Sequence, residues 1–431
     1  MGLKERIESG EAVFGVVGLG YVGLPLVVEM AKSGHRVIGF EVSDGKVTEV
    51  NAGRSYIPDV PSDELAELVS AGLIQATTDF SRVGEVDAVA ICVPTPLNEM
   101  KEPDTSYMES AARQITPYLH PEMLVTLEST TYPGTTEEVV QPILEAGGLK
   151  VGKELYLAFS PERVDPGNPV YQTRNTPKVV GGVTRECTEV AVAFYQRFID
   201  TIVPVSSTRA AEMSKLLENI FRCVNIALIN ELLLVSERMG INIWEVVDAA
   251  KTKPFGFMPF YPGPGLGGHC IPIDPFYLSW KARQFDMHTE FIELAGKTNE
   301  TMPYYVVQRL MNALNTQRKS LAASRILMLG VAYKANIDDM RESPAIKIAS
   351  LLADKDADVV YHDPYVAEFT VDGKSIPLVP LTAEEVAAAD AILVVTDHSH
   401  VDYQLVVDSA QLILDTRNAL KAFDDNKVVR L

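Results

Sequence analysis

Short apolar runs alternate with longer amphipathic stretches along the first part of the chain. The runs at residues 12–17, 36–40, 88–93, 124–128 and 155–159 have the length and composition of buried strands. The stretches between them mix polar and apolar residues in the way that helices and their connecting loops do. Strands that alternate with helices form a parallel sheet with helices on both faces, so the pattern predicts an α/β domain.

The pattern changes between Thr208 and Met239, where apolar side chains recur every three or four residues. The recurring residues are Met213, Leu216, Leu217, Ile220, Val224, Leu228 and Leu232. Glycine and proline are absent until Gly240, which suits the position after a helix. A helix of this length would extend for about 45 Å. We expect it to connect domains or to form the core of a dimer, although the same apolar face could be covered within one monomer.

The alternation of strands and helices resumes in the last third of the chain. A Gly/Pro-rich loop at 262–268 follows the long helix, and further helices are expected over 276–315. Apolar runs at 325–329, 358–361, 391–395 and 412–415 then predict the strands of a second α/β domain. We therefore expect three domains, at 1–205, 206–315 and 316–431.

Composition narrows the classes of function. The 38 Lys and Arg residues against 58 Asp and Glu residues give a net charge of −20, which argues against nucleic acid or an anionic membrane as a partner. An anionic ligand would need helix N-termini and a few well-placed basic residues. We expect no leader segment and no membrane span, because no run approaches the ~20 apolar residues required. Four dispersed cysteines show no disulfide framework, so a cytoplasmic protein is expected.

Gly18, Gly20 and Gly23 form a GxGxxG motif between the first predicted strand and an apolar helix. Such glycines let the backbone approach a pyrophosphate at the helix N-terminus. The motif alone is a weak signal, since a tight turn without a ligand has the same form. Here the next strand ends in Glu41, an acid placed to bind the ribose hydroxyls of NAD and to repel the 2′-phosphate of NADP. Lys46 lies close behind, where it could reach a phosphate or ribose, or only solvent.

Hydroxyl side chains follow two more of the predicted strands. Thr95 follows one, and Ser129 and Thr130 follow the other. Sheets of this kind bind ligands at the carboxyl ends of their strands. Each segment taken alone is more often a plain loop or cap.

Lys215 and Asn219 lie four residues apart on the long predicted helix, with Glu212 on the same side. The spacing by itself favours a solvated surface pair of Glu212 and Lys215 over a functional group, because most such pairs lie on the surface.

Cys270 differs from the other cysteines because it follows the glycine-rich loop, where the backbone can come close to a ligand. It is therefore a candidate nucleophile. Asp274 precedes a proline and could simply cap a helix. No spacing of Cys and His suits a metal site, so no metal is expected.

The second α/β domain offers three basic candidates. Its first strand leads to Lys334 without a GxGxxG motif, so a phosphate contact is more plausible there than a second NAD. Arg341 could reach a pyrophosphate, or merely pair with Asp338 or Asp339. Arg417 follows the last predicted strand. Ser343 is expected to cap the next helix, with proline as its first residue.

Taken together, these motifs resemble the UDP-glucose/GDP-mannose dehydrogenase family over essentially the whole chain. The matching segments are GLGYVGLPL (18–26), VPTP (93–96), EST…PGTT (128–136), SPER (160–163), EMSKLLEN (212–219), PGPGLGGHCIPIDP (262–275) and VAYKANIDDMRESP (331–344). The resemblance implies two doubly wound Rossmann-like domains joined by a long central helix, usually in a homodimer. It implies a four-electron oxidation of a UDP-sugar by NAD, through a thiohemiacetal and a thioester on a cysteine.

The resemblance also implies roles for individual residues. Cys270 is the nucleophile, Lys215 stabilises the oxyanion, Asn219 adds a donor, Asp274 orients water or tunes Lys215, and Thr130 and Glu162 lie near a catalytic water. NAD is expected at Gly18, Leu19, Gly20, Tyr21, Val22, Gly23, Glu41, Lys46, Pro94, Thr95, Ser129, Thr130 and Arg341. The UDP-sugar is expected at Glu162, Arg163, Lys215, Asn219, Tyr261, Gly265, Gly267, Lys334 and Arg417.

One departure bears on the substrate. UDP-glucose enzymes of the family often carry a second Glu shortly after the SPE glutamate, and this chain has Pro166 there. Together with residues 257–278, this form resembles the UDP-N-acetylglucosamine 6-dehydrogenase branch. UDP-glucose and the N-acetylmannosamine or N-acetylgalactosamine sugars remain alternatives, because small pocket changes switch sugars. Two other functions are weighed: a two-electron dehydrogenase of the 6-phosphogluconate type, and a nucleotide-sugar sensor without activity.

Overall fold

The computed structural model describes residues 2–98, 102–165, 167–168, 170–268 and 271–431, which form two compact units. The first unit comprises Met1–Glu218 with Trp280–Met287, and the second comprises Asn219–Ser279 with His288–Leu431. Each unit holds a sheet of mainly parallel strands with helices on both faces. The fold class predicted from the sequence is therefore confirmed.

The sheet of the first unit has the strand order β3-β2-β1-β4-β5-β6-β7-β8. All its neighbouring pairs are parallel except β6 with β7. The strands are β1 (Phe14–Val17), β2 (Val37–Phe40), β3 (Ile74–Thr77), β4 (Ala88–Ile91), β5 (Met123–Leu127), β6 (Leu155–Phe159), β7 (Lys178–Gly182) and β8 (Ile202–Pro204). The parallel strands end at one edge of the sheet, where ligands bind in such folds.

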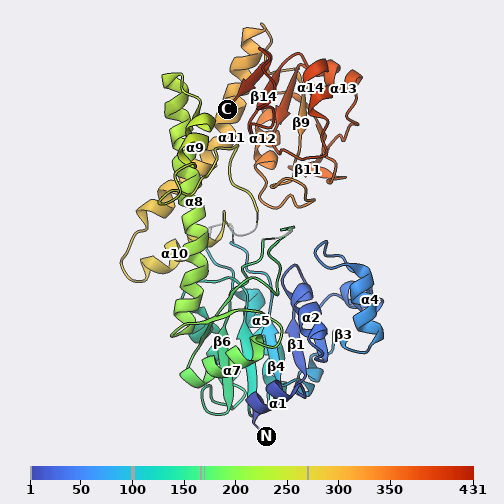
Figure 1. Ribbon diagram of the computed structural model, residues 1–431, viewed down its shortest axis with the longest axis vertical. Helices are drawn as coiled ribbons and strands as arrows, with labels where there is room; N and C mark the ends of the chain where they lie inside the picture. Colours follow the sequence, from blue (N-terminus) through green and yellow to red (C-terminus); the bar gives the residue numbers. More distant parts are fainter. Residues whose placement is uncertain (1, 99–101, 166, 169, 269–270) are drawn as a thin grey trace. The chain divides into compact units, whose positions relative to one another are not determined.

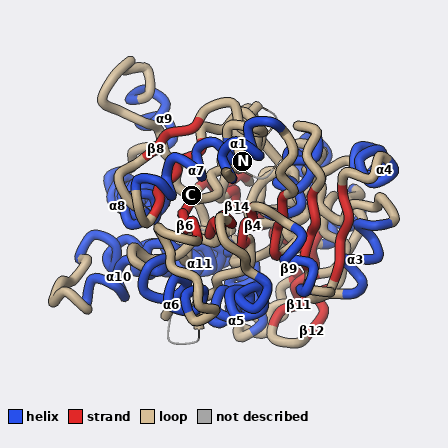
Figure 2. The backbone as a smooth tube through the Cα atoms, turned by 90° about the horizontal axis from the view of Figure 1, so that it is seen from below, coloured by secondary structure: helices blue, strands red, loops and turns tan. Residues whose placement is uncertain are grey.

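Helices cover both faces of this sheet (Figure 1). One face packs against α1 (Leu3–Ser9), α2 (Gly23–Lys32), α4 (Ser62–Ser70) and α7 (Arg185–Tyr195). The other packs against α5 (Ser106–Ile115), α6 (Gln141–Glu145) and the 3-10 turn η1 (Phe80–Glu85). Helices α3 (Asp44–Asn51) and α4 both contact the edge strand β3, and Figure 2 shows these two helices on the right of the view. Two short helical segments, η2 (Thr116–Tyr118) and the π-helical η3 (Thr136–Val140), complete the unit.

The second unit contains a five-stranded parallel sheet in the order β10-β9-β13-β14-β15. Its strands are β9 (Arg325–Leu329), β10 (Asp358–His362), β13 (Ala391–Val394), β14 (Ile413–Asp415) and β15 (Val428–Arg430), and β11 (Phe369–Val371) with β12 (Lys374–Ile376) forms a hairpin (Figure 2). The helices are α9 (Ile243–Ala250), α10 (Asp274–Arg283), α11 (Glu290–Thr316), α12 (Pro344–Ala353), α13 (Ala383–Ala388) and α14 (Tyr403–Ser409). Helices α11 and α12 cover one face, and α13 and α14 cover the other. The last turn of α10 belongs to the first unit.

The nine strands predicted from apolar runs are all present, with bounds shifted by two residues at most. The sequence pattern missed β3, β7, β8, β11, β12 and β15. These strands are three to five residues long, and β3, β8 and β12 bury too little to give a continuous apolar run. The cap expected at Ser343 is confirmed, because its hydroxyl accepts the N–H of Ala345.

The long helix α8 (Thr208–Met239) has the bounds that the sequence predicted, and it passes from the first unit into the second. Gly240 follows it with a φ of +69°, in the left-handed region that glycine favours. Among the described residues, α8 is the one helix long and apolar enough to cross a membrane, with a third of its most apolar window buried. The core helices of soluble proteins can have the same length and composition, so this helix is weak evidence for a membrane span.

Candidate active site

The glycine turn after β1 is built so that two of its glycines are needed by the fold and one is not. A Cβ at Gly18, whose φ is +92°, would lie 2.7 Å from the carbonyl oxygen of Cys92. A Cβ at Gly23 would lie 1.8 Å from the carbonyl oxygen of Gly18. At Gly20, a Cβ would meet no described atom within 4 Å. The turn therefore leaves open space at its second glycine, where a dinucleotide pyrophosphate approaches the backbone in this type of fold.

Glu41 lies at the end of β2 and is buried. One carboxylate oxygen accepts the N–H of Leu19 at 3.1 Å, and the other accepts the N–H groups of Val42 and Ser43 at 3.0 and 3.2 Å. Lys46 lies 3.5 Å from this carboxylate, so it pairs with Glu41. The acid expected at the ribose thus also ties the end of β2 to the glycine turn.

Ser129 connects the loops that follow β4 and β5. Its hydroxyl accepts the N–H of Val93 at 3.0 Å and lies 2.7 Å from the Val93 carbonyl oxygen, to which it donates. The two hydroxyl-bearing loops expected at the cofactor are therefore held together at the carboxyl edge of the sheet. Thr95 is buried in the same region and Thr130 is half-buried.

Glu212 and Lys215 do not form the solvated surface pair that their spacing favours. Glu212 is fully buried, and its carboxylate accepts the N–H of Gly134 at 2.6 Å and the N–H of Thr136 at 2.9 Å. Lys215 is 7% exposed, and its ammonium donates to the carbonyl oxygen of Glu162 at 2.6 Å. Tertiary contacts decided against the surface interpretation, because this face of α8 packs on the loops that follow β5 and β6.

The SPER segment after β6 is fixed by its own side chains. The Oε1 of Glu162 accepts the N–H groups of Arg163 and Val164, both at 2.7 Å. Arg163 donates to the carbonyl oxygen of Pro177 at 2.7 Å and pairs with Glu218 at 2.7 Å. Both residues predicted from this segment therefore have protein partners.

In the second unit, Asn219 and Asp274 are hydrogen-bonded. The amide nitrogen of Asn219 donates to the Oδ2 of Asp274, and its amide oxygen accepts from Arg222. Asn219 and Asp274 are both buried, and Asp274 begins α10. Two residues of the site that sequence reasoning proposed are thus brought together. Cys270 lies outside the described residues.

The glycine-rich loop before Cys270 packs against the segment that carries Tyr333 and Arg341. A Cβ at Gly267 would lie 2.6 Å from the Cβ of Tyr333, and Gly268 donates its N–H to the carbonyl oxygen of Arg341 at 3.0 Å. The Arg341 side chain forms a two-pronged ion pair with Asp339 at 3.0 and 2.6 Å. This is the pairing that the sequence left open, and the contact of Arg341 with NAD stays a prediction.

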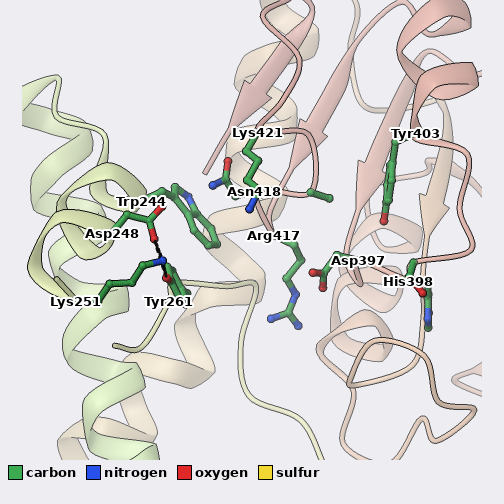
Figure 3. A pocket seen from close by; sticks show the side chains of 12 residues that line it. Trp244, Asp248, Lys251, Tyr261, Asp397, His398, Tyr403, Arg417, Asn418 and Lys421 are labelled. Carbon is green, nitrogen blue, oxygen red and sulfur yellow. Dashed lines mark hydrogen bonds and ion pairs between the residues drawn. The ribbon is translucent and has the colours of Figure 1, made fainter. Parts of the chain in front are cut away.

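A cavity of about 410 Å³ lies in the second unit (Figure 3). Trp244 and Tyr261 stack with ring centroids 5.6 Å apart and an interplanar angle of 17°. Figure 3 shows them on one side, Arg417 in the middle, and Asp397 and His398 on the other side. The Nε of Arg417 donates to the carbonyl oxygen of Val395 at 2.8 Å. Burial lowers the pKa of Arg417 from its usual high value, and the guanidinium remains a cation at any working pH.

The sequence had named two of the lining residues, Tyr261 and Arg417, and Gly263 beside them allows close approach. A Cβ at Gly263 would lie 2.9 Å from the guanidinium of Arg417. Sequence reasoning missed the other lining residues with polar or aromatic side chains, which are Trp244, Asp248, Lys251, Asp397, His398, Ser399, Tyr403, Asn418 and Lys421. Asp397 and His398 could have been found, because they follow β13 at its carboxyl end. Lys334 is half-buried and is not among the lining residues.

Comparison with known proteins defines what these two units are. Residues 12–199, 209–301 and 327–422 match, respectively, the NAD binding domain, the central domain and the UDP binding domain of the UDP-glucose/GDP-mannose dehydrogenase family. The chain belongs to this family. It is an NAD-dependent nucleotide-sugar dehydrogenase, and the cofactor belongs in the first unit, where the open space at Gly20 suits it.

Several relatives of this dehydrogenase are similar over nearly their whole length. The UDP-N-acetyl-D-glucosamine 6-dehydrogenase of Pseudomonas aeruginosa is 37% identical, with 89% of this chain and 90% of the relative covered. The NDP-N-acetyl-D-galactosaminuronic acid dehydrogenase of Ralstonia nicotianae is 35% identical, with 97% and 99% covered. The solved structure of the UDP-D-ManNAc dehydrogenase of Pyrococcus horikoshii has a TM-score of 0.88 at 33% identity, with 97% and 98% covered. Membership of this family removes the support for a one-step hydroxyacid dehydrogenase or an inactive sensor.

Proposed function

We propose that this dehydrogenase oxidises the C6 hydroxyl of UDP-N-acetylglucosamine to the carboxylate, with the formation of two NADH. Two observations support this sugar: the form of residues 160–168 and 257–278, and the similarity to the Pseudomonas aeruginosa enzyme. Relatives named for N-acetylmannosamine and N-acetylgalactosaminuronic acid are nearly as similar to this chain. A sugar that carries an acetamido group therefore has broader support as the substrate than the gluco configuration of that sugar.

The observation that carries the chemistry is the buried Lys215, held by the carbonyl oxygen of Glu162. A fixed cation in a water-poor site stabilises the negative charge that develops on the C6 oxygen. When bound, NAD supplies the hydride acceptor for both oxidations. Cys270 adds its sulfur to the aldehyde carbon to give a thiohemiacetal, which keeps the aldehyde bound. After the second oxidation, water attacks the thioester carbon, and the carboxylate and the free thiol are released.

The remaining residues of the site have supporting roles in this proposal. Asn219 and Asp274, which share a hydrogen bond, position the substrate oxygen and water. Thr130 and Glu162 are proposed to act on the water that hydrolyses the thioester. Gly265 and Gly267 are proposed to contact the sugar through their backbone.

The uridine diphosphate is proposed to bind in the cavity of the second unit. The stacked rings of Trp244 and Tyr261 offer an aromatic face for a base. Arg417 and Lys421 supply positive charge in a chain of net charge −20, and Lys251, which is paired with Asp248 at 2.6 Å, adds to it. These are the few placed cations that an acidic protein needs in order to bind a diphosphate. Lys334 is proposed as a further phosphate contact.

A cytoplasmic homodimer is proposed as the working state. Large apolar side chains on α8 are exposed in the single chain, among them Leu217 at 60%, Leu228 at 51% and Val235 at 46%. An exposed apolar stripe on a long helix is what a helix-mediated dimer would bury.

The proposal is tested by the amount of NADH formed from a limiting quantity of each UDP-sugar. A ratio of two with UDP-N-acetylglucosamine supports both the mechanism and the sugar. A ratio of two with another sugar alone keeps the mechanism and overturns the substrate, whereas a ratio of one contradicts the four-electron route. Cys270→Ala should abolish the formation of carboxylate, and Cys187→Ala, a buried cysteine on α7, is the matched control.

A further inference from the structure

A buried group of charged side chains lies at the carboxyl edge of the first sheet. Lys178 is the first residue of β7 and is 5% exposed. Its ammonium lies 2.7 Å from the Oε2 of Glu128, which follows β5, and the other oxygen of Glu128 accepts the hydroxyl of Tyr195 at 2.7 Å. Side chains of this kind are rarely so buried unless they are paired.

The antiparallel direction of β7 explains why Lys178 is there. Strands β5 and β6 end at the ligand-binding edge of the sheet, and β7 begins at that edge because it runs the opposite way. The register pairs Ala158 with Gly182 and Phe159 with Gly181. Continued by three residues, the same register sets Glu162 opposite Lys178.

Three contacts join the start of β7 to the segment that carries Glu162. The Lys178 ammonium lies 3.7 Å from the Oε2 of Glu162. The hydroxyl of Ser160 donates to the carbonyl oxygen of Val179 at 2.8 Å. The guanidinium of Arg163 donates to the carbonyl oxygen of Pro177 at 2.7 Å. The backbone carbonyl of Glu162 is the group that accepts from Lys215. Lys178 therefore contacts the segment on which the placement of Lys215 depends.

Lys178 is the cation that balances the carboxylates of Glu128 and Glu162. Burial opposes a charge on Lys178, but Glu128 and Glu162 outweigh that cost and raise its pKa, so the ammonium stays protonated. Burial also raises the pKa of Glu128, and the nearby charge of Glu162 adds to the shift. Burial likewise raises the pKa of Cys92, which lies close to the pair, so it remains a neutral thiol. Without Lys178, two carboxylates would face each other with no cation between them.

We propose that Lys178 is a positioning residue for the oxidation: its ammonium holds Glu128 and Glu162 together and thereby aims the Glu162 carbonyl at Lys215. Lys178 acts through Glu162 and does not touch the substrate. This inference rests on the roles proposed above for Lys215 and Glu162.

The test compares Lys178→Met and Lys178→Arg with the control Lys150→Met, which removes a lysine paired with Glu145 on the surface of the same unit. A misplaced catalytic group can cost on the order of 100-fold in rate. We therefore expect Lys178→Met to lower kcat by about that factor with little change in KM, and to shift the acid limb of the pH profile of kcat. Lys178→Arg should retain most of kcat, and Lys150→Met all of it.

The double variant Glu128→Gln/Lys178→Met separates positioning from burial of charge. It removes the Glu128 carboxylate that Lys178→Met leaves unpaired, so it should recover thermal stability. If Lys178→Met alone does not fold, the double variant takes its place in the kinetic comparison. A kcat that stays low in the double variant supports the proposal. A kcat that returns with stability, or that is unchanged in Lys178→Met, overturns it. Lys215→Ala and Glu162→Gln are measured alongside: if both keep wild-type kcat, the proposed site itself is wrong.

Discussion

Asp363 accepts an unusual number of hydrogen bonds for one carboxylate in the second unit. It follows β10, is 5% exposed and accepts from five donors. Its Oδ2 accepts the N–H groups of residues 331–332 at 2.7 and 3.3 Å and the Nε2 of His398 at 3.0 Å. Its Oδ1 accepts the N–H groups of residues 365–366 at 2.8 and 3.1 Å. Because the N–H of Asn336 donates to the Nδ1 of His398, the ring carries its proton on Nε2.

Asp363→Asn preserves the shape of the side chain but replaces one acceptor oxygen with an NH₂ donor. If the NH₂ group takes the Oδ1 position, the N–H groups of residues 365–366 lose their acceptor. If it takes the Oδ2 position, the N–H groups of residues 331–332 and the Nε2–H of His398 lose theirs. Each such loss costs about 1–3 kcal/mol, so we expect one of the two segments that Asp363 ties down, residues 331–336 or residues 363–366, to be destabilised by at least about 2 kcal/mol. Since 1.4 kcal/mol is a factor of ten in an equilibrium constant, a loss of 2 kcal/mol speeds local opening roughly 30-fold.

Hydrogen–deuterium exchange of the whole protein, followed by mass spectrometry, measures this opening directly. A local measurement is needed because a chain of two units does not unfold in one step. In Asp363→Asn, exchange should be about 30-fold faster over residues 329–337 or over residues 363–367, according to which side of the side chain the NH₂ group faces. The control Asp354→Asn, at an exposed position after α12, should change the free energy of local opening by no more than about 0.5 kcal/mol. Unchanged exchange in Asp363→Asn would refute the reasoning.

The effect of Asp363→Asn should also depend on pH. Burial alone would raise the pKa of Asp363, but the bonds from His398 and the backbone N–H groups outweigh it and lower the pKa. The carboxylate therefore stabilises the folded state above its ordinary pKa of about 3.9, and this stability is lost as the pH falls below it. Thermal melts should show the gap between wild type and variant narrowing below about pH 4.

Three further outcomes are expected. Gly20→Ala should leave the melting temperature unchanged but weaken NAD binding in calorimetry, because a methyl group there would occupy the open space of the turn. Gly23→Ala should lower the melting temperature, because its Cβ would lie 1.8 Å from a carbonyl oxygen. Equal melting temperatures for the two variants would contradict this. Arg417→Met should raise the KM for the UDP-sugar by roughly 10- to 100-fold, since a hydrogen bond to a charged group is worth about 1.5–3 kcal/mol, and an unchanged KM would place the diphosphate elsewhere. Burial raises the pKa of Cys223 to about 11, so iodoacetamide at neutral pH should label Cys270 well before Cys223, as read by peptide mass spectrometry.

The sequence by itself determined the fold class, the strands with continuous apolar runs and the whole of α8. These features depend on local periodicity, which tertiary contacts left intact between Thr208 and Met239. The glycine turn was also determined locally, because Gly18 needs a positive φ and Gly23 needs the absence of a side chain. Ser343 could be assigned as a cap for the same reason, since a cap bonds within its own turn.

Only the tertiary structure decided which polar residues are buried and with whom they pair. Glu212 and Lys215 have the spacing of a surface pair, yet each bonds to a loop 50 residues or more away along the chain. Lys178 belongs to a short strand that no pattern revealed, and its partner Glu128 is distant in sequence. Trp244 and Tyr261 meet Arg417 only because α9, a loop and the end of β14 converge on one cavity. Spacing along a helix or strand indicates which side chains share a face, whereas the desolvation that gives them their chemistry depends on what the fold packs against that face.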